Sequence, residues 1–187
     1  MDLPYGSDLV SAFVTNVGLV TSDGPWGINI MAAEWTHLLS YKPGLVAVCI
    51  GPSKATAENI AATKEFGVSI AATDQNVLSS LAGNFHAKEF RKFDALKELG
   101  FSFIPSKQIA APLVEGSALR LECRLVDTWD KADHVMFIGE ALEAFRDLSK
   151  TPLAYHKGKY WTLGENIPKP AAEELEKYKR VMEKHKR

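Results

Sequence analysis

The sequence contains few cysteines and no histidines at the spacing of a metal-binding pair. Only two cysteines occur, Cys49 and Cys123, in separate strand-like runs with no CxxC or Cys/His spacing. They could pair only if the fold brought them together, and reduced thiols are the expected state. The five histidines show no HxxxH pairing, and no Ser/His/Asp or Cys/His arrangement is visible. The sequence therefore predicts no metal site and gives little support for nucleophilic chemistry by a side chain.

Long apolar runs and an excess of positive charge are also missing. No apolar stretch approaches the roughly 20 residues that cross a bilayer, and the N-terminus lacks the basic region and apolar core of a secretory signal. The formal net charge is -1, which argues against a general nucleic-acid binder, because neutralising phosphate needs a basic surface. We expect a cytoplasmic protein with neither a membrane nor a nucleic acid as partner.

The chain has enough apolar content for one core. At 187 residues with 46% hydrophobic residues, it is long enough for one domain and short for two. No repeat, linker or low-complexity segment interrupts it. We expect residues 1–187 to form a single domain, with a core over about 10–165 and a C-terminal helix over about 170–187.

Most of the first two-thirds predicts β-strands. The expected strands are apolar or β-branched runs next to turn residues, at 12–22, 45–50 and 67–73, whereas 28–40 is ambiguous between strand and loop. The run "ALRLECRLVDTW" alternates, with Leu119, Leu121, Cys123 and Leu125 on one face. The run "HVMFIGEALEAF" follows it after the turn-like "DKAD". Together these two runs predict an antiparallel hairpin.

Helices are expected between the strands and at the end. Ser53 is the expected N-cap of a helix over 54–66, which Gly67 would stop. A second helix runs through "QNVLSSLA", capped by Asp74 and stopped by Gly83, and a third through "DALKEL". The C-terminal "PAAEELEKYKRVMEKHKR" carries oppositely charged i,i+4 pairs and an apolar stripe, so it predicts a helix with a solvated charged face.

Strands outnumber helices and do not alternate with them. This pattern disfavours a parallel Rossmann sheet and favours an antiparallel barrel or sandwich with peripheral helices. No GxGxxG follows a strand and no GxxxxGK[ST] is present. A nucleotide, if one binds, is therefore held by other loops.

The segment "GPSKATAENI" (51–60) follows the apolar run "LVAVCI" and opens a helix. A helix start offers free N–H groups and partial positive charge, while Ser53 and Thr56 add hydroxyls and Lys54 adds a full charge. These groups suit an anion such as phosphate. The alternative is that Ser53 only caps the helix and Lys54 points to water, and the segment alone favours this ordinary explanation.

Three other segments have both a functional and a structural explanation. In "NIMAAEWT" (29–36), Ala32 and Ala33 would let a flat molecule approach the backbone, or the segment is an ordinary strand end. In "AGNFHAKEF" (82–90), Gly83 and Asn84 can adopt left-handed conformations, with Phe85, His86 and Lys88 nearby. His134 and His156 each stand alone, and a lone histidine on a strand usually has a structural role.

Taken in order, these segments resemble the flavin reductase-like family of FMN-binding split-barrel proteins. The matching stretches are "NIMAAEW", "LSYKPGLVAVCIGPSKATAENI", "GNFHAKEFRKF", "HVMFIGE" and "PLAYHKGKYWTLG". They cover about residues 10–165. The resemblance implies a mainly β fold, a six-stranded antiparallel Greek-key split β-barrel with peripheral α-helices. It also implies a homodimer with flavin bound at or near the subunit interface.

The resemblance further implies a cofactor site. The segment expected to line the isoalloxazine through backbone groups matches Asn29, Met31, Ala32, Ala33, Glu34 and Trp35. The segment expected to hold the flavin phosphate matches Ser53, Lys54 and Thr56, and a glycine-centred loop matches Gly83, Asn84 and Phe85, with Lys92-Phe93 at its end. His134 matches a histidine near the nicotinamide side of the flavin and is the expected catalytic residue. Many relatives carry small hydroxyl residues where this sequence has Ala32 and Glu34, which puts the redox behaviour in question.

The function implied is that of an FMN-binding oxidoreductase, an NAD(P)H-dependent flavin reductase. Hydride would pass from NADH or NADPH to FMN, or to FAD in its place. The cofactor itself would perform the redox step, and the protein would bind and orient it. Expected acceptors are a partner oxygenase, ferric iron or a small redox protein. The main alternative is a flavoredoxin-like electron carrier without nicotinamide turnover. A non-flavin β-barrel binding module is a third hypothesis, and pyridoxamine-phosphate oxidase-like activity ranks low.

Overall fold

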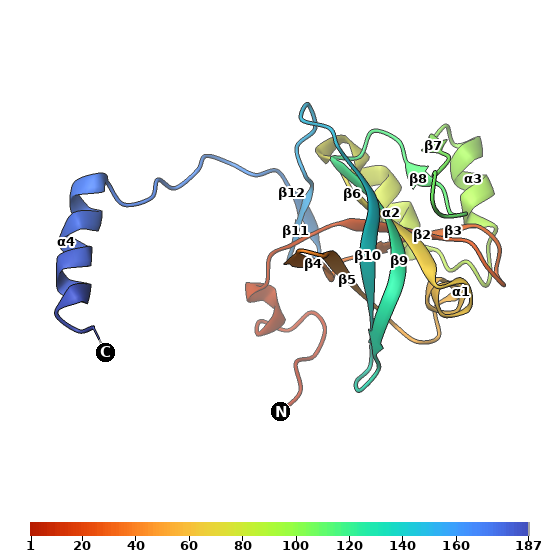
Figure 1. The fold of residues 1–187 in the computed structure, drawn as a ribbon. Coiled ribbons are helices and arrows are strands. Elements are labelled where there is room, and N and C mark those ends of the chain that lie inside the picture. Colours follow the sequence, from red (N-terminus) through yellow and green to blue (C-terminus); the bar gives the residue numbers. More distant parts are fainter. Residues whose placement is uncertain (187) are drawn as a thin grey trace.

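A curled, seven-stranded antiparallel sheet forms the body of the protein in the computed structural model, which describes residues 1–186 (Figure 1). Its strand order is β3-β2-β6-β9-β10-β5-β4. The strands are β2 (Gly18–Ser22), β3 (Asn29–Ala33), β4 (Thr36–Tyr41), β5 (Gly44–Ile50), β6 (Glu65–Ile70), β9 (Leu119–Trp129) and β10 (Val135–Arg146). The expected class, an antiparallel split barrel with peripheral helices, is confirmed, but the sheet has seven strands instead of the six that the resemblance implied.

Short strands and helices surround this sheet. The strands β1 (Thr15–Asn16), β11 (Ala154–His156) and β12 (Lys159–Trp161) form a small sheet, and β7 (Phe103–Ile104) pairs with β8 (Leu113–Val114). The helical elements are η1 (Val10–Ala12), α1 (Ala55–Thr63), η2 (Thr73–Gln75), α2 (Asn76–Asn84), α3 (Lys92–Glu98) and α4 (Ala172–Glu183). Among residues 1–186, no helix has both the length and the apolar character needed to span a bilayer.

The expected hairpin of the two long runs is confirmed. Strands β9 and β10 pair antiparallel, from Met136 opposite Trp129 to Arg146 opposite Leu119, with a register shift between Ile138 and Gly139. The ambiguous segment 28–40 contains two strands, β3 and β4, separated by a short bend, and the run 12–22 is divided between β1 and β2.

The larger core cluster fills the curl of the sheet. Phe66 lies at its centre, fully buried, against Cys123 and Phe137. A side chain on Gly139 could not fit there, because its Cβ would lie 2.5 Å from the Phe66 ring. Both cysteines are free, so the expected reduced state fits the structure. Burial raises the pKa of Cys123 to about 12 and also raises the pKa of Cys49.

Three helix ends differ from the sequence prediction. Helix α1 ends at Thr63, and its C-cap Lys64 adopts the left-handed conformation with φ 62°, so Gly67 is not the stop. Gly67 lies within β6, where a Cβ would lie 2.3 Å from Thr21 Oγ1, so close strand packing explains the glycine. Asp74 does not cap α2 but forms an ion pair with Lys150, and α2 continues through Gly83 instead of stopping there.

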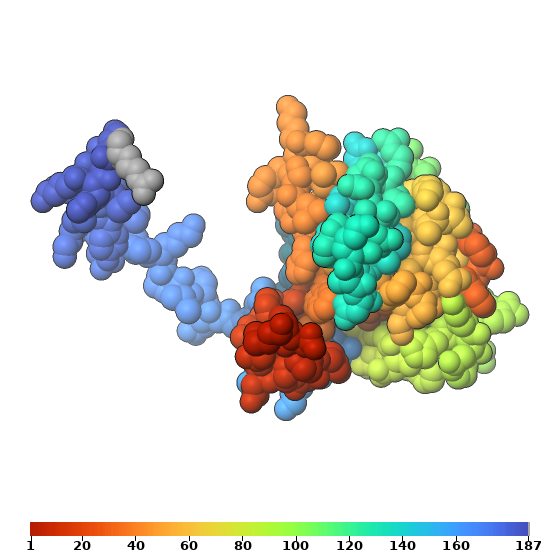
Figure 2. All heavy atoms as spheres, turned by 90° about the horizontal axis from the view of Figure 1, so that it is seen from below, coloured from red at the N-terminus to blue at the C-terminus, as the bar shows by residue number. Residues whose placement is uncertain are grey.

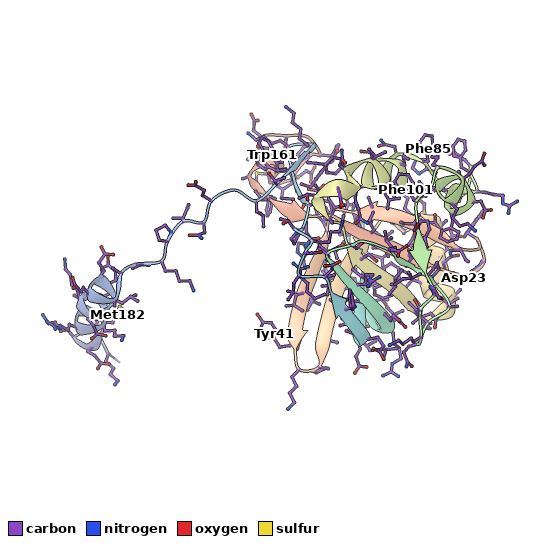
Figure 3. The ribbon with its side chains drawn as sticks, turned by 90° about the horizontal axis from the view of Figure 1, so that it is seen from above. Asp23, Tyr41, Phe85, Phe101, Trp161 and Met182 are labelled. Carbon is purple, nitrogen blue, oxygen red and sulfur yellow. The ribbon has the colours of Figure 1, made fainter. Side chains whose placement is uncertain are left out.

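Helix α4 stands apart from the barrel at the end of an extended segment (Figures 1 and 2). None of its twelve residues, all of them described, is buried. The apolar stripe of Leu175, Tyr178 and Met182 is itself exposed, and Figure 3 shows Met182 far from the body. The barrel alone therefore positions the candidate site.

Candidate cofactor site

The start of helix α1 is open to a ligand. The helix begins at Ala55 with Lys54 as its N-cap residue, and no side chain caps it, so the predicted cap by Ser53 is wrong. The first N–H groups of an α-helix lack partners within the helix, and the positive end of its dipole lies there. Without a side-chain cap, these donors remain free to bind an anion.

A buried amide next to this helix start has an unused oxygen. Asn29, 3% exposed at the start of β3, donates from Nδ2 to Thr56 Oγ1 at 2.8 Å. Its Oδ1 has no partner in the described part of the chain. An unpaired buried acceptor costs free energy, and such groups usually have a partner in native proteins. A hydroxyl or N–H of a bound ligand would supply the missing donor.

Lys92 brings a second cation to the same place. Its side chain is buried at the start of α3, and Nζ donates to the carbonyls of Ala82 at 2.8 Å and Phe85 at 2.9 Å. These bonds tie the end of α2 to α3. Burial and then the nearby Lys54 charge lower the pKa of Lys92 from 10.5 to about 8. Lys54 and Lys92 thus bring positive charge to this place, and one carboxylate, that of Glu89, also lines it.

These groups line a cleft of about 310 Å³, here called the lysine cleft. Strand β3, the start of α1, the end of α2 and the following loop form its walls. Seven of the sequence-predicted residues line it: Asn29, Met31, Ser53, Lys54, Thr56, Gly83 and Phe85. Figure 3 shows Phe85 at the helical side of the body, far from Tyr41 at the tip of the β4–β5 hairpin.

A second cleft of about 340 Å³, here called the tyrosine cleft, adjoins the first along β3. It is lined by Tyr5, Tyr155 and Tyr160 together with the predicted residues Ala32, Glu34, Gly83 and Asn84. Gly83 lines both clefts, and a Cβ there would lie 3.5 Å from Ala32 Cβ, so α2 packs close to β3. Gly83 and Asn84 are helical, so the expected left-handed conformations are absent at these two described residues.

The tyrosine cleft combines aromatic rings with one carboxyl group. Partial burial raises the pKa of Glu34. Burial and the neighbouring Tyr5 raise the pKa of Tyr155 to about 12, so its phenol stays protonated. The Tyr160 hydroxyl accepts a bond from Ser80 at 3.1 Å. The cleft therefore offers hydroxyl donors and apolar ring faces, which suit a flat, partly polar molecule.

The remaining predicted residues lie outside both clefts. Ala33 is buried in the core. Trp35 lines a third cleft, of about 310 Å³, together with Glu34 and Tyr5. The ring of His134 packs on Trp35 at 4.6 Å, and its Nδ1 lies 3.0 Å from Asp133 Oδ1. The catalytic role of His134 stays a prediction.

Sequence reasoning named His86, Lys88 and Lys92 near the expected site without assigning them a function, and it missed Trp26 and Glu58. His86, Lys88 and Lys92 line the lysine cleft, and Trp26 and Glu58 contact Lys88. The basic spacing of "HAKEFRK" after a helix was the available signal for the first three. Among residues 1–186, no three His, Cys, Asp or Glu side chains gather as a metal site requires.

The chain is similar to several known proteins. The chain is 30% identical over 156 residues to the reductase component of the Rhodococcus opacus 4-nitrophenol 4-monooxygenase/4-nitrocatechol 2-monooxygenase, covering 82% of this chain and 77% of that protein. It is 25% identical over 149 residues to the NADH-dependent FAD reductase of Streptomyces globisporus, covering 79% of each. The solved flavoredoxin of Desulfovibrio vulgaris (Miyazaki F) superposes with a TM-score of 0.75 at 23% identity, covering 92% of this chain and 98% of that one. A family model, the flavin reductase like domain, matches residues 10–164. The expected family is thereby confirmed, and the chain belongs to the flavin reductase-like family.

Proposed function

We propose that this protein is an NAD(P)H-dependent flavin reductase that binds FMN along β3, with residues 10–165 forming one flavin-binding domain. The observation that carries this proposal is the junction of the two clefts at Gly83. One cleft has an uncapped helix start and clustered lysines, which suit a phosphate. The other has aromatic walls, which suit a ring. Flavin mononucleotide has a phosphate at one end and a flat ring system at the other.

The residues of the lysine cleft would hold the tail of the cofactor. Lys54 and the first N–H groups of α1 would bind the phosphate, and the unpaired Asn29 Oδ1 would accept a hydrogen bond from a ribityl hydroxyl. Ala32 leaves room for the ring, and Glu34, whose raised pKa eases protonation, would lie near its polar edge. The bound flavin would supply the redox chemistry, accepting hydride from a reduced nicotinamide.

The structure also supports a proposed homodimer. Strand β4 is an edge strand of the seven-stranded sheet. Its Leu38, Leu39 and Tyr41 are 61%, 48% and 91% exposed. An exposed apolar edge is a pairing surface unless it is covered. We propose that a second copy covers it, and that the electrons leave to a partner oxygenase, ferric iron or a small redox protein.

The test is to purify the protein, denature it and identify any released flavin by chromatography, then to measure NADH and NADPH oxidation with added FMN and FAD. The proposal predicts flavin binding and flavin-dependent oxidation of at least one nicotinamide. A protein that stays colourless and binds no added flavin refutes it. It would then be a non-flavin barrel with Ser53 and Trp35 as structural residues.

A flavoredoxin-like electron carrier is the second candidate. The position of His134 favours it, because that residue packs on Trp35 outside both clefts. Stopped-flow mixing separates the two candidates. A reductase loses its flavin absorbance with NADH or NADPH, whereas a pure carrier loses it only with dithionite or a reduced protein partner.

A further inference from the structure

Two cross-links join the α2–α3 loop to helix α1 above the lysine cleft. The first pairs Lys54 Nζ with His86 Nδ1 at 3.3 Å. The second pairs Glu58 Oε1 with Lys88 Nζ at 2.5 Å. Residues 54 and 58 lie one helical turn apart, so the cross-links are successive and hold the loop over the helix start.

The first cross-link, between Lys54 and His86, determines the hydrogen-bonding role of His86. An ammonium group can only donate hydrogen bonds, so His86 Nδ1 must accept from Lys54. The neutral imidazole then carries its proton on Nε2. His86 and Lys54 both line the lysine cleft, so this N–H is available as a donor to a phosphate bound there. His86 and Lys54 thus form a pair suited to the outermost oxygens of a phosphate.

The second cross-link, between Glu58 and Lys88, belongs to a cluster of three side chains that also includes Trp26. Trp26 Nε1 donates to Glu58 Oε2 at 2.6 Å, and the Lys88 ammonium lies 4.9 Å from the Trp26 ring centre. Hydrogen bonds from Lys88 and Trp26 lower the pKa of Glu58 and keep it ionised. The Trp26 segment is itself fixed, because its backbone N–H donates to the side chain of the fully buried Asn59 at 3.0 Å.

The cluster stands where a longer ligand would leave the cleft. Lys88 lines the lysine cleft, and Trp26 lines the neighbouring cleft. Ala87 and Lys92 line both clefts, so the two clefts adjoin at this loop. A ligand that extended from the lysine cleft into the neighbouring cleft would pass Lys88 on one side and Trp26 on the other, and Glu58 holds these two side chains together.

We propose that these cross-links make the protein select FMN, which ends in a phosphate monoester, over FAD, whose adenylate continues past the same phosphate. His86 binds the terminal phosphate with Lys54, and the cluster of Trp26, Glu58 and Lys88 blocks the adenylate. This inference rests on the proposed function, since it concerns the specificity of the same site.

The experiment measures dissociation constants for FMN, FAD and riboflavin by fluorescence titration. The wild-type protein is compared with Trp26→Ala, Glu58→Gln and His86→Gln. We expect wild-type protein to bind FMN at least about tenfold more tightly than FAD. Trp26→Ala and Glu58→Gln should strengthen FAD binding and bring the two constants together. His86→Gln should weaken FMN binding by about tenfold, the effect of one good hydrogen bond to a charged group, with little change for riboflavin.

Glu140→Gln is the matched control. Glu140 on β10 forms an ion pair with Arg124 at 2.7 Å and lines neither of these two clefts. This variant should keep the wild-type ratio of FMN to FAD affinity. Circular dichroism identifies any variant that does not fold, and Glu58→Gln, which changes one surface atom, keeps the test valid if Trp26→Ala fails.

Equal affinity for FMN and FAD in wild-type protein overturns the inference but leaves the flavin site intact. An unchanged ratio in folded Trp26→Ala and Glu58→Gln overturns the blocking role, and equal losses for FMN and riboflavin in His86→Gln overturn the phosphate role. Absence of binding to all three flavins overturns the proposed function itself.

Discussion

FMN affinity should fall as the pH rises above about 8, because Lys92 loses its proton there in the free protein. Its pKa is lowered from 10.5 to about 8 by burial and by Lys54. A phosphate dianion bound in the same cleft would favour the charged ammonium and raise this pKa again. Binding then takes up a proton wherever free Lys92 is neutral and bound Lys92 is charged.

The size of the effect follows from the two pKa values. If the pKa of Lys92 returns to 10.5 in the FMN complex, Lys92 is protonated in both the free and the bound protein well below pH 8. Its titration then leaves the FMN affinity unchanged in that range. Above pH 8 it falls by up to tenfold per unit, so the dissociation constant at pH 9 should be about tenfold weaker than at pH 7. Riboflavin has no phosphate, and its affinity should change much less over the same range.

Isothermal titration calorimetry at pH 7, 8 and 9 measures this directly. Titrations at pH 9 in two buffers of different ionisation enthalpy report the proton uptake. The Lys92→Arg variant keeps a cation and its donors but does not titrate in this range, so its FMN affinity should be flat. An FMN dissociation constant that is the same at pH 7 and 9 in wild-type protein, with no proton uptake, refutes the reasoning.

Three further predictions test other parts of the structure. Lys54→Ala should weaken FMN binding about ten- to a hundredfold and riboflavin binding much less, because it removes one charge-assisted contact; equal loss for both, measured by titration, contradicts the phosphate assignment. Glu34→Gln should change the midpoint potential of bound flavin, measured by spectroelectrochemistry, because the carboxyl group lines the tyrosine cleft; an unchanged potential and affinity would exclude a contact between Glu34 and the flavin. Gly139→Ala should lower the free energy of unfolding by about 1–3 kcal/mol through overpacking against Phe66. Gly44→Ala, whose Cβ would meet its neighbour at 3.8 Å, is the control in urea denaturation and should change stability little.

Local patterns predicted the hairpin of β9 and β10, because alternation of Leu121 and Cys123 with charged residues has the period of a strand. They also indicated a possible anion site at the start of α1, since hydroxyls, a lysine and a helix start occur within a few residues, although the segment alone favoured an ordinary helix cap and the site stays a prediction. Both signals are contained in short windows of sequence. The same short windows predicted wrongly that helix α1 ends at Gly67. A glycine that is required by close packing between strands cannot be distinguished, in the sequence alone, from a glycine that ends a helix.

Features that depend on distant contacts could not be read from the sequence. Glu58 and Lys88 are 30 residues apart, and nothing in either segment indicates that they pair. The uncapped start of α1 is another case, because Ser53 is a common cap residue and only the backbone geometry shows that it does not act as one. The burial of Lys92 likewise depends on a distant contact, because its ammonium group binds the carbonyls of Ala82 and Phe85 at the end of α2.

Burial raises the pKa of Cys49 and Cys123 above the ordinary thiol value, that of Cys123 to about 12, so the small thiolate fraction of a cysteine at neutral pH is reduced further at both positions. Reduced flavins pass electrons to dioxygen when no other acceptor is present, and the product is hydrogen peroxide. Peroxide oxidises thiolates, whereas protonated sulfur reacts slowly. The barrel thus shields its two sulfhydryl groups from the by-product of the chemistry that its family performs.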